Sequence, residues 1–149
     1  MTEEERARAY LVRLFRHRPR SRYEVVTRLR QKGFSRETIE SVVEQAERAG
    51  LLDDARFAQL WVEDRLARRP RSRQMLEREL RAKGVAPEHI HRAIARAELD
   101  DEALAKQLVA ERWPRLLALD EQTRLRRLTS FLRRRGFSEE IIRRALDNP

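Results

Sequence analysis

The apolar positions of this chain recur with the three- and four-residue spacing of an α-helix. No segment of useful length alternates with the period of two that is typical of a strand. In the first fifty residues this pattern predicts helices over about 4–17, 22–32 and 36–49. We therefore expect an all-α protein.

Residues that begin and end helices separate these segments. Pro19 follows the first helix, and Ser21 with Glu24 three residues later forms a capping-box pattern for the second. Gly33 stands where a left-handed residue would end the second helix, and Ser35 is an N-cap for the third. Each boundary thus supports the helices that the apolar spacing predicts.

The chain repeats itself at an offset of about 51 residues. The segment RPRSR occurs at 18–22 and again at 69–73, and Lys-Gly-Phe at 32–34 aligns with Lys-Gly-Val at 83–85. A further shift finds Arg-Gly-Phe at 135–137, although this third copy lacks RPRSR. Self-similarity of this kind predicts a repeat protein, here three tandem three-helix repeats that form an elongated, curved array.

We assign the repeats to residues 1–50, 51–99 and 100–149. In the second repeat, Asp53 and Ser72 are expected N-caps, and Pro87 opens the last helix at a first-turn position. In the third, Asp100 or Asp101 is the expected cap of a helix that Pro114 should kink or end.

Charge limits the classes of partner. The chain has no Cys. It has 31 Arg, three Lys and a formal net charge of +9, and this positive charge favours a polyanionic partner. A GC-rich genome would explain the Arg-to-Lys ratio equally well, but it does not explain the net charge. No apolar stretch is long enough to span a membrane, and the acidic start does not resemble a secretory signal. We expect a cytoplasmic protein.

The sequence offers no catalytic constellation. His89 and His91 are the nearest approach to a metal motif, but residues two apart on a helix point in different directions, so we favour surface positions for both. The pairs at 53–54 and 100–101 could bind a cation, although helix capping is their favoured role. We predict no metal, no cofactor and no enzymatic activity, with a nuclease as the alternative.

The two RPRSR turns are the favoured binding elements. Each combines three guanidinium groups with a helix N-terminus, whose free backbone N–H groups attract anions, and we expect both turns to be exposed. A solvated turn without a partner is the alternative. Tyr10, Trp61 and Trp113 hold equivalent positions, where core packing is favoured over base stacking. The predicted basic binding residues are Arg18, Arg20, Arg22, Arg28, Arg69, Arg71, Arg73, Lys83, Arg126, Arg127, Arg133, Arg134 and Arg135.

Several motifs resemble the RecX family of bacterial recombinase regulators, and the likeness covers nearly the whole chain. The most specific stretch is Gly-Leu-Leu-Asp-Asp-x-Arg-Phe-Ala at 50–58. The others are Ala-x-x-Tyr-Leu at 7–11, Ser-Arg-x-Glu-Val at 21–25 and Glu-Leu-x-x-Lys-Gly-Val at 79–85. Tyr23 and Val26 fit the family pattern loosely, and the third repeat diverges from it.

The resemblance implies a protein that binds the RecA filament in or along its groove and mostly restrains ATP hydrolysis, strand exchange and filament growth. It implies RecA, single-stranded DNA and, as a further partner, double-stranded DNA, with the chain acting as a monomer. The family has no catalytic residues to carry over. A general DNA- or RNA-binding helical repeat without RecA specificity is the alternative.

Overall fold

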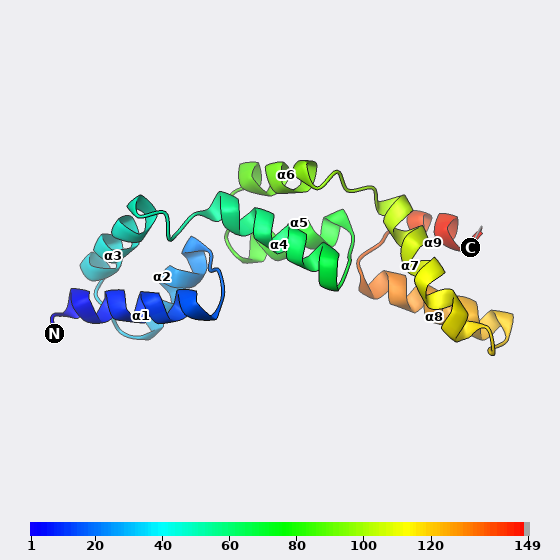
Figure 1. The fold of residues 1–149 in the computed structure, drawn as a ribbon, viewed down its shortest axis with the longest axis horizontal. Coiled ribbons are helices and arrows are strands. Elements are labelled where there is room, and N and C mark those ends of the chain that lie inside the picture. The colour runs from blue at the N-terminus through cyan, green and yellow to red at the C-terminus, as the bar shows by residue number, and fades with distance from the viewer. Residues whose placement is uncertain (148–149) are drawn as a thin grey trace. The chain divides into compact units, whose positions relative to one another are not determined.

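The computed structural model describes residues 1–147, and this part of the chain forms nine α-helices and contains no strand (Figure 1). The all-α prediction is confirmed. The helices are α1 (Glu3–His17), α2 (Arg22–Gln31), α3 (Arg36–Arg48), α4 (Asp54–Arg68), α5 (Arg73–Ala82), α6 (Pro87–Arg96), α7 (Asp101–Leu116), α8 (Glu121–Arg134) and α9 (Glu139–Asp147).

The internal contacts of the chain divide it into two compact units. One comprises residues 1–61 and 80–93, and the other comprises 62–79 together with the described residues from 94 onward. The division runs through α4, α5 and α6, so the helices of the middle repeat contribute to both units. The boundaries 1–50, 51–99 and 100–149 remain a prediction.

The first unit is built around α1, α2 and α3. Both α1 and α2 pack against α3 (Figure 1), because each presents an apolar stripe at helical spacing. The buried cluster consists of Ala7, Leu11, Val25, Leu29, Ile39, Val42, Val43, Ala46 and Leu52. Ser21 caps α2 in the predicted capping box with Glu24, and Gly33 has the predicted left-handed conformation, with φ of 88°.

In the second unit, α7 packs against α9, and α8 packs against both (Figure 1). Its buried cluster consists of Ala105, Leu108, Val109, Leu128, Phe131, Leu132, Phe137, Ile142 and Ala145. Asp100, rather than Asp101, caps α7 through a bond from the Ala103 N–H. Pro114 lies inside α7, which ends two residues later at Leu116.

Among residues 1–147, every helix is too short or too polar to cross a membrane.

Candidate nucleic-acid interface

The first RPRSR segment is a buried joint rather than an exposed turn. Ser21, which is 0% exposed, donates from its Oγ to the carbonyl oxygen of Lys83 at 2.7 Å. The Ser21 Oγ also accepts the N–H of Glu24 at 3.2 Å. Close by, a β-carbon on Gly84 would lie 2.5 Å from the Cβ of Tyr23. The N-terminus of α2 is therefore packed against the C-terminal cap of α5.

The second RPRSR segment makes the same joint one repeat later. Ser72 is 1% exposed, donates from its Oγ to the carbonyl oxygen of Gly136 at 2.7 Å, and accepts the N–H of Met75 at 3.1 Å. Its own N–H donates to the carbonyl oxygen of Arg135 at 2.9 Å. A β-carbon on Gly136 would lie 2.7 Å from Met75. The N-terminus of α5 thus packs against the cap of α8.

The expected anion sites at these helix N-termini are already filled by carboxylates of the chain. Asp54 accepts the backbone N–H of Arg22 at 2.9 Å, and Asp101 accepts that of Arg73 at 3.0 Å. Asp53 and Asp100 cap their own helices, as predicted. Each Asp-Asp pair therefore caps two helices, and the prediction that these N-termini are free to bind phosphate is wrong.

Three of the six turn arginines are bound within the protein, so the predicted exposure is wrong for part of each turn. Arg71 is only 9% exposed and pairs with Glu79, which makes it part of the joint. Arg18 pairs with Glu24 at 2.5 Å, and half-buried Arg20 donates to the carbonyl oxygen of Leu14. Each of these three side chains also donates to a backbone carbonyl oxygen of residues 14–19 or 69, and so helps to hold its turn.

The remaining turn arginines are more accessible. Arg22 is exposed and pairs with Glu47 at 2.8 Å, and Arg73 reaches the carbonyl oxygen of Leu99. Arg69 is exposed and has no ion-pair partner among residues 1–147, and the same holds for Arg28 on α2. Only these side chains keep the binding potential that was predicted for the turns.

Glu24 is the electrostatic centre of the first joint. Its carboxylate binds Arg18, accepts the backbone N–H of Ser21 at 3.1 Å and lies 3.3 Å from the Lys83 Nζ. Burial by itself would raise the pKa of Glu24. The Arg18 hydrogen bond, the Ser21 N–H and the charges of Arg18 and Lys83 outweigh burial and lower that pKa to about 2. Lys83, a predicted binding residue, is held here and over the Trp61 ring.

The predicted basic residues at the end of α8 separate into two groups. Arg133 pairs with Glu139 at 2.6 Å, and Arg135 donates to the carbonyl oxygen of Pro70 and lies over Phe131. Burial, followed by repulsion from other arginines, lowers the pKa of Arg135. Arg126, Arg127 and Arg134 are instead exposed and line one groove.

This groove, here called the third-repeat groove, lies between α7 and α8 and has a volume of about 440 Å³. Its lining is basic above an apolar floor and contains no carboxylate: Arg112, Arg115, Leu116, Arg126, Arg127, Leu128, Ser130, Phe131 and Arg134. Sequence reasoning missed Arg112 and Arg115. Their three-residue spacing on α7 was the available signal, because such residues share a helix face.

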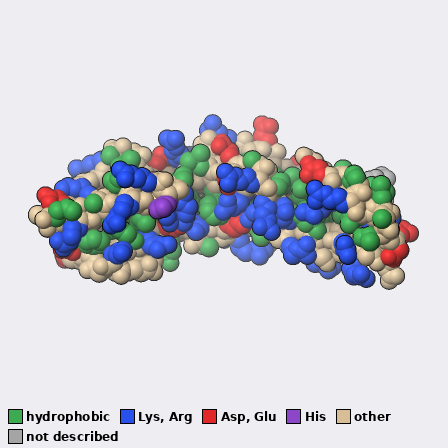
Figure 2. Space-filling view, turned by 60° about the horizontal axis from the view of Figure 1, so that its bottom comes forward, with side chains coloured by type: hydrophobic (Ala, Val, Ile, Leu, Met, Phe, Trp, Pro, Cys, Tyr) green, Lys and Arg blue, Asp and Glu red, His purple; other side chains and the backbone are tan. Residues whose placement is uncertain are grey.

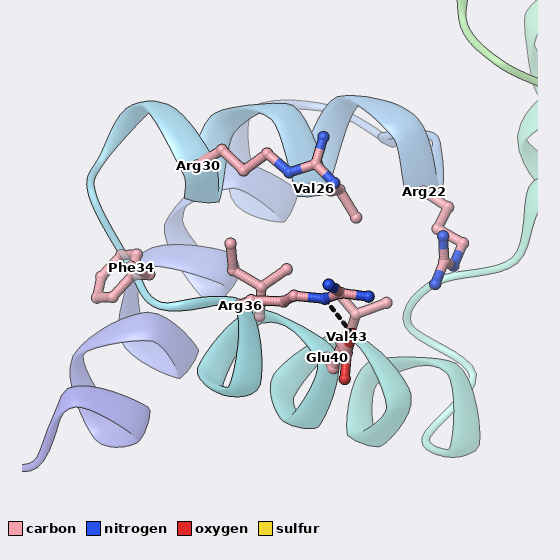
Figure 3. A pocket seen from close by; sticks show the side chains of 8 residues that line it. Arg22, Val26, Arg30, Phe34, Arg36, Glu40 and Val43 are labelled. Carbon is pink, nitrogen blue, oxygen red and sulfur yellow. Dashed lines mark hydrogen bonds and ion pairs between the residues drawn. The ribbon is translucent and has the colours of Figure 1, made fainter.

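A second groove, the first-repeat groove, runs between α2 and α3 and has a volume of about 340 Å³ (Figure 3). Val26, Phe34, Ile39 and Val43 form its apolar part, and Arg22, Arg30, Arg36 and Glu40 its polar part. Arg36 pairs with Glu40 at 3.1 Å. This arrangement suits an apolar side chain flanked by acidic groups. Figure 2 likewise shows Lys and Arg side chains among hydrophobic ones on one face.

The three equivalent aromatic residues belong to the packing of their repeats. Tyr10 lies 6.4 Å from Phe34, with Lys32 over its ring, and packs against the first cluster. Trp113 packs against the buried cluster of the second unit and carries Arg124 over its ring at 4.9 Å. The favoured prediction of core packing is confirmed for Tyr10 and Trp113. Trp61 is half-buried, lies 5.8 Å from buried Phe57 and carries Lys83 over its ring.

The two histidines differ from each other. His91 is exposed, as predicted, but His89 is half-buried, and its Nδ1 has no hydrogen-bond partner within residues 1–147. The surface prediction is therefore wrong for His89, which lines a small cavity near Asp53 and Asp54. Within the described residues there is no group of three or more His, Cys, Asp or Glu that could hold a metal ion.

Repeated helical bundles with basic grooves define this chain as a helical-repeat binding protein. Models of the first, second and third three-helix domains of RecX match residues 7–45, 53–94 and 100–146. Regulatory protein RecX of Streptomyces coelicolor is 38% identical over 96% of this chain and 79% of its own length. Regulatory protein RecX of Amycolatopsis mediterranei is 42% identical over 83% of this chain and 71% of its own length. The chain belongs to the RecX family.

Solved structures support the fold. The crystal structure of RecX from Lactobacillus salivarius superposes with a TM-score of 0.77 at 16% identity, covering 98% of this chain and 96% of that one. A second crystal structure of regulatory protein RecX gives a TM-score of 0.74 at 20% identity and covers 97% of this chain and 72% of that one. The three-helix architecture is thus retained where few residues are identical.

Proposed function

We propose that this chain regulates the RecA recombinase by binding the RecA–DNA filament and restraining its ATP hydrolysis, strand exchange and growth. The observation that carries the proposal is membership of the RecX family of regulatory proteins over nearly the whole chain. The proposed place of action is the bacterial cytoplasm, and the proposed active form is the monomer.

The mechanism we propose is occupancy rather than catalysis. Several repeats on one chain raise the effective concentration of each binding surface once the first is bound. A chain bound in this way across neighbouring RecA protomers would hold their interface in one arrangement and so slow a cycle that requires it to change. Inhibition then needs no reaction by this protein.

The two grooves support this proposal, because a nucleoprotein filament offers protein and nucleic acid together. The first-repeat groove combines Val26 and Phe34 with the exposed Arg30, which suits a protein surface that carries apolar and acidic groups. The third-repeat groove is lined by arginines and suits an anion. A general nucleic-acid-binding protein would need only the second kind of surface.

The test is RecA ATP hydrolysis on single-stranded DNA, measured while this protein is titrated to a stoichiometric ratio. We expect the steady-state rate to fall as the ratio rises. The matched control replaces RecA with an unrelated DNA-dependent ATPase on the same DNA, whose rate should not change. An unaltered RecA rate at stoichiometric ratio would contradict the proposal, and equal inhibition of both enzymes would favour general DNA binding.

A further inference from the structure

We propose that the third-repeat groove is a binding site for the phosphate backbone of nucleic acid, with Arg112, Arg115, Arg126, Arg127 and Arg134 as its anion-binding residues. This inference deepens the proposed function and rests on it for its biological role. Binding to DNA alone tests the groove without RecA, so the two can fail separately.

None of the five groove arginines forms an ion pair within residues 1–147, although Asp120, whose pKa is lowered chiefly by Thr123, also feels the charge of Arg126. None has a carboxylate oxygen within 4.0 Å among residues 1–147, and the groove lining itself contains no Asp or Glu. Five like charges around one groove repel one another, and Coulomb repulsion is strongest where water is partly excluded. A ligand that supplies several negative charges would remove this repulsion.

Some exposed arginines elsewhere in residues 1–147 are neutralised, whereas others, such as Arg28 and Arg69, are not. Arg36, Arg48 and Arg144, for example, pair with Glu40, Glu44 and Glu140 at the i,i+4 spacing of a helix surface. In α8, no Asp or Glu follows Glu121 to offer such a pair. On α7, Glu111 stands four residues before Arg115, but it accepts from Gln107 and forms no ion pair with the groove arginines. What sets the groove apart is therefore that five arginines, unpaired within the described residues, gather around one hollow.

One guanidinium group of the groove is held in place. The Arg112 Cζ lies 3.6 Å from the centre of the Phe131 ring, which is the geometry of a cation–π contact. A guanidinium stacked on a ring keeps its N–H donors in its own plane, directed away from the ring. Arg112 is thus positioned to donate to phosphate oxygens with less loss of side-chain entropy than a free arginine.

The groove favours nucleic acid over a protein ligand. Of its three apolar residues, Leu128 is 1% exposed, Phe131 is 5% exposed and Leu116 is half-buried, so Leu116 is the main apolar side chain that a partner would meet. Protein interfaces depend on apolar contact at their centre, whereas nucleic-acid affinity comes largely from phosphate contacts and counterion release. A site with many charges and little exposed apolar area fits the second case.

The experiment is fluorescence anisotropy of labelled oligothymidine and of a labelled duplex, titrated with the full chain over a range of salt concentrations. The test variant carries Arg126→Gln, Arg127→Gln and Arg134→Gln. The control variant carries Arg92→Gln, Arg96→Gln and Arg143→Gln, which removes the same charge outside the groove. A second test variant, Arg112→Gln with Arg115→Gln, probes the α7 side.

We expect the triple groove variant to bind at least about ten-fold more weakly at low salt. Losing three phosphate contacts should reduce the salt slope for the single strand by about 2. The control should keep the slope of the unmodified chain. Comparing the single strand with the duplex shows which of the two the groove prefers. The proposal is supported if the triple groove variant binds either of them more weakly than the unmodified chain does.

Thermal unfolding separates lost binding from lost folding. Because Gln removes repulsion, we expect the free triple variant Arg126→Gln, Arg127→Gln, Arg134→Gln to unfold at or above the midpoint of the unmodified chain, and oligothymidine to stabilise it less. Equal weakening in the groove and control variants would overturn the proposal by attributing binding to net charge. Poly-glutamate serves as a probe for an acidic protein partner. If the triple groove variant binds DNA as the unmodified chain does but loses binding to poly-glutamate, the proposal is overturned in favour of such a partner.

Discussion

The hydroxyl of Ser72 and the carbonyl oxygen of Gly136 are joined by a 2.7 Å hydrogen bond that spans 64 positions of the sequence. Ser21 makes the equivalent bond to the carbonyl oxygen of Lys83. The serine of each RPRSR segment therefore has two functions, since it caps its own helix and also holds a helix end of the following repeat. These joints link neighbouring repeats.

Replacing Ser72 with Ala should destabilise the protein by about 2 kcal/mol, because it removes an N-cap and leaves a buried carbonyl oxygen without its donor. Ser138→Ala is the matched control. Ser138 also caps a helix, through the Ile141 N–H, but it is exposed. We expect the control to cost about 1 kcal/mol or less. Urea unfolding followed by far-UV circular dichroism measures both, and equal losses would show that the joint adds nothing.

Gly84 and Gly33 offer a test of close packing at the joint. Both have positive φ, 73° and 88°, but only at Gly84 would a β-carbon meet another residue, Tyr23 at 2.5 Å. Gly33→Ala should cost about 1–2 kcal/mol from the left-handed backbone alone. Gly84→Ala should cost a further 1–3 kcal/mol, approximately the range for overpacking. Thermal unfolding midpoints that fall equally in the two variants would contradict the close approach.

The lowered pKa of Glu24 predicts a specific loss of stability in acid. Its pKa falls from 4.5 to about 2 on folding, so its ionised form stabilises the protein fully above pH 4.5. This contribution, on the order of 3 kcal/mol, is lost as the pH falls through 2. Glu24→Gln keeps the capping-box geometry without the charge. The difference in unfolding free energy between the unmodified chain and this variant should be largest above pH 5 and shrink toward pH 2. A difference independent of pH would exclude this role.

Arg71 and Arg69 belong to the same turn but should respond differently to substitution. Arg71 is 9% exposed and pairs with Glu79, whereas Arg69 is exposed and has no ion-pair partner in residues 1–147. We expect Arg71→Ala to cost about 3 kcal/mol, since it breaks a largely buried pair, and Arg69→Ala to change stability by less than about 0.5 kcal/mol. Urea unfolding compares them. Similar stabilities in the two variants would restore the interpretation of this segment as a solvated turn.

The sequence was sufficient to predict the helices, because local chemistry determines them. Ser21, Gly33 and Ser35 act within one or two turns of their own position, and their predicted roles were confirmed. Apolar spacing identified the first core for the same reason.

The binding surface was harder to predict because charge does not reveal its own partner. Arg71 and Arg134 look alike in the sequence, yet Glu79 neutralises the first and no described carboxylate pairs with the second. The segment RPRSR is repeated because it joins one repeat to the next. The third repeat, which has no following repeat among residues 1–147, has Asp120 as a simple cap instead.

The most direct test of the account is the affinity of the fluorescently labelled chain for RecA assembled on single-stranded DNA, compared with bare single-stranded DNA at the same salt concentration. Binding through both kinds of groove predicts tighter association with the filament. It also predicts that the groove variant Arg126→Gln, Arg127→Gln, Arg134→Gln retains part of that affinity. Equal or weaker binding to the filament than to bare DNA would contradict the account.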